Sequence, residues 1–170
     1  MSEQTPAAAA GSRGDIADRA DCERLVRAFY ERALADEIIG FIFTDVARLD
    51  LEAHVPEITS FWETILLGAQ SYGGGAFAPH IRLHAQVGLK PGHFQRWLLL
   101  WRTTVDELFA GPRAELAKAH AERVAGAFGR RLAAMPSPYG PGDPDAAAPP
   151  VGGLLTISAW GPGGAGSAPS

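Results

Sequence analysis

The apolar positions in the central part of the chain recur every three or four residues, which is the period of an amphipathic helix rather than of a strand. A first helix is predicted to end near residues 36–40, and a second is predicted to run from a cap at Asp50 to Gly68. The inward stripe of the first helix consists of Leu25, Val26, Phe29, Tyr30, Ala33 and Leu34. The inward stripe of the second consists of His54, Ile58, Phe61, Trp62, Ile65 and Leu66.

Two further helices follow with the same period. The third is predicted to begin near Pro91 and to end before Gly111, and the fourth fills the segment after Pro112. Their stripes are Phe94, Trp97, Leu98, Trp101, Thr104, Val105 and Leu108, and then Leu116, His120, Val124, Ala127, Phe128 and Leu132. The segment SYGGGAFAP, residues 71–79, is predicted to be a loop because consecutive glycines disfavour a regular element. The pattern therefore predicts an all-α domain.

Composition sets the expected limits of that domain. Residues 136–170 contain eight prolines and eight glycines, which predicts a disordered tail after a folded domain at residues 15–135. Residues 1–14 lack a helical or strand period and are expected to form a flexible leader. The formal net charge of -4 gives no basic surface for nucleic acid.

The single cysteine, Cys22, excludes a disulfide framework and a cysteine-based metal site, and it favours a reducing, cytoplasmic location. No segment reaches the roughly 20 apolar residues of a membrane span, so no membrane partner is expected. The common phosphate-binding, nucleophile-elbow and zinc-protease motifs are also absent.

Two polar side chains, Tyr30 and His54, lie on otherwise apolar helix faces. Each needs a hydrogen-bond partner if it is buried, because an unmade bond costs roughly 1 to 3 kcal/mol. Either the two groups bond to each other or to the backbone, or they face a polar ligand in the core. Pro56 disfavours a regular helix next to His54, so the direction of that imidazole stays open.

The stretch PHIRLHAQVGLKPGHFQRW contains three histidines, His80, His84 and His93. A zinc pair at His80 and His84 would have helical spacing, but no third ligand lies near it. The alternative is that one imidazole points inward and binds a metal whose remaining positions are filled by a cofactor. One histidine suffices in this way for haem iron.

Three stretches together resemble the group III truncated haemoglobins of the globin family: LVRAFYERALADEIIGFIF, HVPEITSFWETILLG and LHAQVGLKPGHFQRWLLLW. The combination includes Phe43 thirteen residues after Tyr30, a histidine seven residues before Phe-Trp, and a histidine nine residues before His-Phe. The resemblance covers about residues 16–135. It implies a truncated globin two-over-two helical sandwich that binds haem b, iron protoporphyrin IX.

The resemblance also implies a set of site residues. His84 would be the iron ligand, while His80 and His93 would be surface or packing histidines. The residues expected to bind the cofactor are Phe43, His54, Ile58, His84 and Trp97, and those expected to stabilise a ligand on the distal side are Tyr30, His54 and Trp97.

The function implied by the resemblance is reversible binding of O2, NO, CO or a similar small ligand at a histidine-ligated iron. Three hydrogen-bond donors would slow ligand release, which suits oxygen scavenging, nitric oxide dioxygenation or peroxide chemistry better than oxygen storage. A nitric oxide dioxygenase activity would require a reductase, which the sequence does not identify. The alternatives are a haem redox enzyme with peroxidase-like or electron-transfer activity, and a helical sensor domain without haem.

Overall fold

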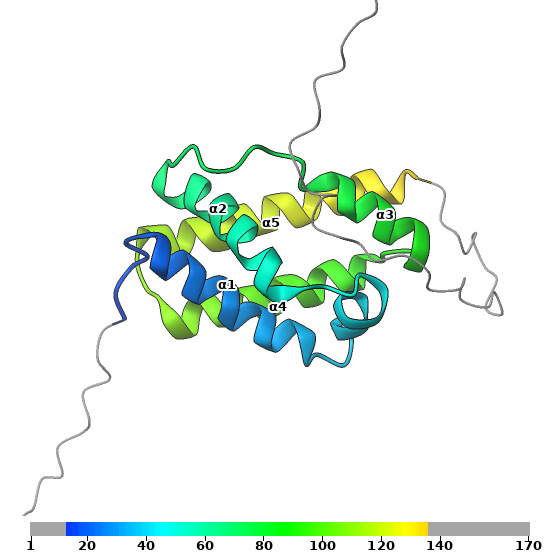
Figure 1. Cartoon of the computed structure of the whole chain (residues 1–170), viewed down its shortest axis with the longest axis horizontal. Helices are drawn as coiled ribbons and strands as arrows, with labels where there is room; N and C mark the ends of the chain where they lie inside the picture. Colours follow the sequence, from blue (N-terminus) through cyan, green and yellow to red (C-terminus); the bar gives the residue numbers. More distant parts are fainter. Residues whose placement is uncertain (1–12, 136–170) are drawn as a thin grey trace, which may run out of the picture.

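This computed structural model describes residues 13–135 of the chain (Figure 1). Within that range it contains five α-helices and one short π-helix, joined by turns and loops. In chain order they are α1 (Arg19–Leu34), η1 (Ile42–Val46), α2 (Leu51–Leu67), α3 (Phe77–Val87), α4 (Pro91–Leu108) and α5 (Pro112–Ala133). The all-α prediction is thus confirmed for this range. The predicted tail, and all but the last two residues of the predicted leader, lie outside the described residues.

Helix boundaries follow local chemistry where a side chain can satisfy the free backbone groups. Asp18 accepts a hydrogen bond from the Asp21 amide at the start of α1, at 3.0 Å. Asp50 accepts one from the Ala53 amide at the start of α2, and Gly68 ends that helix with a left-handed φ of 73°. Both boundaries of α2 were predicted from the sequence.

The long helices form two layers, with α1 and α2 in one and α4 and α5 in the other (Figure 1). Helix α1 packs against both α2 and α4, and α5 packs against α4 and α2, so a single core lies between the layers. Its fully buried members include Leu25, Phe29, Val55, Trp101 and Val105. The arrangement is the predicted two-over-two sandwich.

Helix α3 departs from the sequence prediction. It begins at Phe77, so the last three residues of the expected loop are helical. Gly74 and Gly75 have φ values of 95° and 96°, which confines the glycine-specific conformations to the residues just before the helix. Both His80 and His84 therefore belong to one regular helix.

Helix α2 continues without a break through Pro56. The carbonyl of Pro56 accepts a hydrogen bond from the Ser60 hydroxyl at 2.9 Å and a longer one from the Arg19 guanidinium at 3.4 Å. The proline removes one amide donor near the start of the helix, where the flanking turns hold the backbone in place. His54 is accordingly held in regular helical geometry.

Two aspartates connect segments that are far apart in the sequence. The carboxylate of Asp15 accepts hydrogen bonds from the Arg113 and Ala114 amides, both at 2.9 Å, and so caps α5. Asp36 accepts hydrogen bonds from the Ile38 and Ile39 amides and pairs with Arg96 of α4 at 2.7 Å. Asp15 lies just before α1 and Asp36 just after it, so these contacts hold both ends of α1 against the layer formed by α4 and α5.

Candidate functional site

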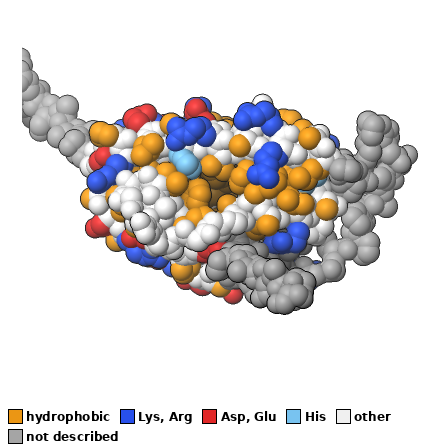
Figure 2. Space-filling model, turned by 90° about the horizontal axis from the view of Figure 1, so that it is seen from above, with side chains coloured by type: hydrophobic (Ala, Val, Ile, Leu, Met, Phe, Trp, Pro, Cys, Tyr) orange, Lys and Arg blue, Asp and Glu red, His pale blue; other side chains and the backbone are white. Residues whose placement is uncertain are grey.

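An apolar cavity opens between the two layers and α3. It is lined mainly by aliphatic and aromatic side chains from all six helical elements, with a few polar groups among them. Figure 2 shows this face as a hollow with hydrophobic side chains inside it and basic side chains around it. The cavity suits a mainly apolar ligand with a few polar anchoring points.

Five of the predicted site residues line this cavity, and they come from four different elements. Tyr30 lies on α1, Phe43 on η1, His54 and Ile58 on α2, and Trp97 on α4. Phe61 and Trp62, which belong to the inward stripe predicted for the second helix, also reach the wall. Sequence positions up to 67 residues apart therefore meet at one site only because the layers fold together.

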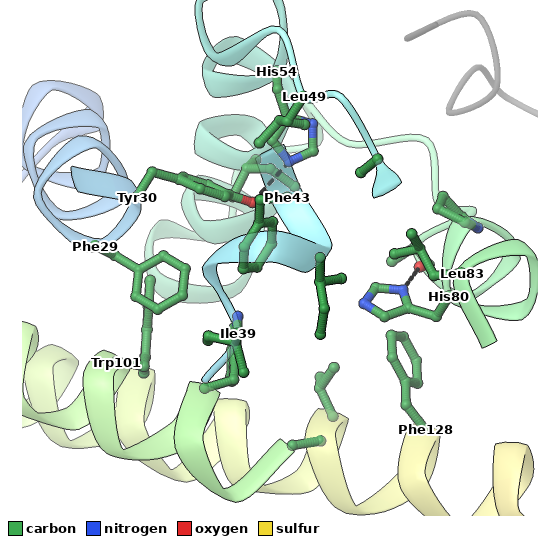
Figure 3. Close-up of a pocket in the computed structure, with 18 of the residues that line it drawn as sticks. Phe29, Tyr30, Ile39, Phe43, Leu49, His54, His80, Leu83, Trp101 and Phe128 are labelled. Carbon is green, nitrogen blue, oxygen red and sulfur yellow. Dashed lines mark hydrogen bonds between the residues drawn. The ribbon is translucent and has the colours of Figure 1, made fainter. Parts of the chain in front are cut away.

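Tyr30 and His54 form a buried pair on one side of the cavity (Figure 3). The Tyr30 hydroxyl lies 2.8 Å from Nε2 of His54, and the two residues are only 6% and 2% exposed. Burial raises the pKa of Tyr30 and, together with the nearby His80, lowers the pKa of His54 to about 4. At neutral pH the tyrosine is therefore protonated and the imidazole is neutral, and the two share one buried hydrogen bond. Of the alternatives that the sequence left open, the two groups bond to each other, and both also line the cavity.

His80 projects into the cavity from α3, on the side away from Tyr30 and His54 (Figure 3). Its Nδ1 lies 2.8 Å from the carbonyl oxygen of Ala76, one turn earlier in the same helix, and Phe128 packs against the ring at 4.8 Å. Burial lowers the pKa of His80, so the ring is neutral at pH 7. In a neutral ring that donates Nδ1–H to a carbonyl, the lone pair is on Nε2, which is the atom that ligates metals.

His84, the predicted iron ligand, does not line the cavity. It is 6% exposed, and neither ring nitrogen has a hydrogen-bond partner. Consecutive residues on a helix point about 100° apart, so His84 diverges from its neighbour Leu83, which does face the cavity. His80, three residues before Leu83, shares that inward face. The structure therefore replaces His84 with His80 as the histidine of α3 that faces the cavity.

The prediction of His84 rested on its distance from His93, whereas the structure places His80, one turn earlier in α3, on the cavity wall. The sequence signal that could have shown this is Leu83. It is apolar and lies three residues after His80, so the two side chains share one face of a helix. His93 also lines the cavity, from the first turn of α4. Its Nδ1 accepts a hydrogen bond from the backbone amide of Lys90 at 3.2 Å. His80 and His93 are thus cavity residues rather than the surface or packing residues we expected.

The described residues contain no group of three or more histidine, cysteine, aspartate or glutamate side chains that could hold a metal. The zinc pair considered for His80 and His84 therefore has no further protein ligands in this range. A metal ion bound by His80 would therefore need most of its ligands from a cofactor rather than from protein side chains in this range. Within the same range, no helix has the length and apolar character needed to cross a membrane.

The helix order, the two crossed layers and the cavity beside a short helix define a truncated globin fold. Among solved structures, the chain matches the crystal structure of group III truncated hemoglobin from Campylobacter jejuni. The TM-score is 0.62 at 23% sequence identity, over 71% of this chain and 94% of that one. Neither a protein-family model nor a curated protein sequence matches the chain. The similarity is one of fold.

Proposed function

We propose that this protein is a truncated globin that binds haem b in the cavity and takes His80 as the axial iron ligand. The single observation that carries the proposal is the His80 side chain, held at Nδ1 by the Ala76 carbonyl within a mainly apolar wall. Haem needs few polar anchors because most of its surface is apolar, and a neutral imidazole is enough to bind its iron.

The donor set fits haem better than it fits a bare metal ion. Haem brings four nitrogen ligands of its own, so a single histidine ligand is sufficient, and the described residues contain no cluster of carboxylates, histidines or cysteines that would suit a bare ion. Phe43 and Ile58 supply apolar contact surface at the cavity wall. The solved relative that matches the fold is itself named a truncated hemoglobin, which supports the same assignment.

Haem in this site would supply a ferrous iron that reversibly binds O2 or another diatomic ligand. The chain's own contribution is a set of hydrogen-bond donors on the side opposite His80. Tyr30 is the first, because its hydroxyl proton can turn from His54 toward a ligand in the cavity. Trp97 adds an indole N–H, and His54 can re-form its bond to Tyr30 when the ligand leaves.

This arrangement favours retention of a polar diatomic ligand over rapid release. We therefore favour oxygen or nitric oxide chemistry, with electrons supplied by a reductase, over oxygen transport. Rapid consumption of NO by the oxygenated protein, compared with its autoxidation alone, tests that assignment.

The axial ligand can be tested by absorption spectra of the ferric, ferrous and ferrous-CO forms. We expect His80→Gly to lose the histidine-ligated ferrous spectrum, and free imidazole to restore it. His84→Gly is the matched control, since it removes a buried imidazole from the same helix outside the cavity wall. If His84→Gly loses ligation and His80→Gly keeps it, His84 is the ligand. No Soret band in the wild type after haem reconstitution would refute haem binding.

A further inference from the structure

The cavity reaches the surface as a hollow, and apolar side chains dominate what a partner meets there (Figure 2). Its wall carries the rings of Phe43, Phe61 and Phe128, among others. Asp50 is the one carboxylate among the described residues of the wall, and it is held as the cap of α2 by the Ala53 amide. Apolar groups that remove such a surface from water are bound favourably whatever their source. The cavity therefore suits an apolar peptide segment as well as an apolar cofactor.

The described chain ends close to this cavity. Helix α5 contributes Phe128 to the wall, and its last helical residue, Ala133, lies about 8 Å further along the helix axis. In the last turn, the guanidinium carbon of Arg131 lies 3.7 Å from the centre of the Phe77 ring at the start of α3. Figure 1 shows the end of α5 beside α3. The sequence after residue 135 therefore begins beside the cavity.

That sequence contains one apolar segment. Residues 154–160 read LLTISAW, with no charged side chain, between stretches rich in proline and glycine. We call these residues the apolar tail segment. A packed tryptophan alone removes about 150 to 250 Å² from water, and seven residues are too few to bury a tryptophan, an isoleucine and two leucines among themselves. The segment therefore gains from a surface that covers its side chains.

The linker between α5 and this segment is long enough to reach the cavity. It consists of residues 136–153, which are 18 residues. A chain of this length spans about 20 Å on average when it is flexible and at most about 60 Å when it is fully extended. Since α5 itself forms part of the cavity wall, either regime allows the segment to return to the mouth.

The charges of the linker and of the cavity rim are of opposite sign. The linker contains Asp143 and Asp145 and no lysine or arginine. Arg82, Lys90 and Arg131 each lie within three residues of a residue on the cavity wall, and Figure 2 shows basic side chains around the hollow. Complementary charges favour a folded-back arrangement over one directed into solvent.

We propose that the apolar tail segment folds back and docks in the mouth of the cavity, where it competes with haem. The linker keeps the segment at an effective concentration on the order of millimolar, so a weak contact is enough to populate the docked state. Haem displaces the segment because it adds a bond to an imidazole to a larger apolar contact. The docking itself needs no haem, so it goes beyond the proposed function.

The docking is tested by paramagnetic relaxation in the NMR spectrum of the full-length, haem-free protein. Ser158→Cys carries a nitroxide within the segment, and the native Cys22 is fully buried, so the label reacts with the introduced thiol. We expect the methyl signals of Leu83 and Leu89 on the cavity wall to broaden strongly. Leu116, an exposed leucine of α5 away from that wall, should broaden much less.

Two paired variants of the labelled chain separate apolar docking from mere proximity. Leu154→Ser combined with Ile157→Ser should lose the broadening at the wall. Ala146→Ser combined with Ala147→Ser is the matched control in the linker and should keep it. Equal broadening at all three leucines, or the same broadening in both paired variants, refutes the docking. Broadening of an unlabelled isotope-enriched chain by a labelled partner chain refutes the folding back within one molecule.

The competition is tested by stopped-flow uptake of haemin, followed at the Soret band. The Leu154→Ser and Ile157→Ser chain should take up haemin several-fold faster than the Ala146→Ser and Ala147→Ser chain, and equal rates refute the competition. If no chain develops a Soret band, the proposed haem function and the competition both fall, while the broadening still decides the docking. If the broadening is absent and the Soret band forms, the docking falls and the haem function stands.

Discussion

The hydrogen bond between Tyr30 and His54 offers a test that depends on the apolar surroundings of the cavity. The perturbation is Tyr30→Phe, which removes only the hydroxyl. Its oxygen lies 2.8 Å from Nε2 of His54, and both residues are buried, so water does not readily replace the lost donor. The variant should therefore be destabilised by more than the modest net value of an average hydrogen bond.

The expected magnitude follows from what is left behind. An acceptor stripped of its donor in a buried site costs about 1 to 3 kcal/mol. For a domain between 100 and 150 residues, this corresponds to a fall in Tm of roughly 3 to 6 °C per kcal/mol. His54→Leu should cost a similar amount, because it strands the Tyr30 hydroxyl instead. The double variant replaces both partners with apolar groups and should recover most of the loss.

The assay is a double-mutant cycle of unfolding free energies from denaturant titration, with the haem content of all four proteins held the same. A coupling energy of about 0.5 to 3 kcal/mol is expected for two groups in direct contact. If the double variant is as unstable as the sum of the two single variants, the groups do not form the buried bond described, and the reasoning fails.

Three other predictions follow. Tyr30→Phe should raise the O2 dissociation rate about 2- to 12-fold in stopped flow, the equivalent of losing about 0.5 to 1.5 kcal/mol of hydrogen bonding; an unchanged rate means that the hydroxyl does not reach the ligand. The Arg96 guanidinium holds the pKa of Asp36 below its ordinary value, so native Asp36 contributes stability above about pH 4 that is lost in acid. The free-energy difference between wild type and Asp36→Asn should accordingly shrink as the pH falls below about 4, which denaturant titrations at several pH values would measure. Asp15→Ala should cost about 0.5 to 2 kcal/mol through loss of the α5 cap, measured by thermal melting, and an unaltered Tm would show that the cap is not needed.

The sequence predicted the long helices well because their determinants are local. Asp50 and Gly68 bound α2 as expected, and Pro91 and Pro112 open α4 and α5. Helix α3 was missed in its first turn, because Phe77 follows glycines whose local preference favours a loop. Packing of α3 against η1 and α5 overrides that preference, and no local pattern shows this contact.

The candidate site was predictable to a similar extent and for a similar reason. Tyr30, Phe43, His54, Ile58 and Trp97 were placed correctly on the cavity wall, since each lies in phase with an apolar stripe or with a recognisable motif. The position of His80 on the same wall was not predicted, because it depends on the rotation of the short helix α3 about its own axis. The sequence distance to the next helix does not determine that rotation.

The sequence by itself determined that residues in the described range form amphipathic helices, and which of their faces are apolar, because helical periodicity is a property of neighbouring residues. Only the tertiary structure decided which histidine of α3 faces the cavity, that Asp15 caps α5, and that Trp62 of α2 stacks on Trp101 of α4. Each of these depends on how separate elements meet. That meeting is set by the packing of whole side-chain surfaces, which short-range sequence spacing does not encode.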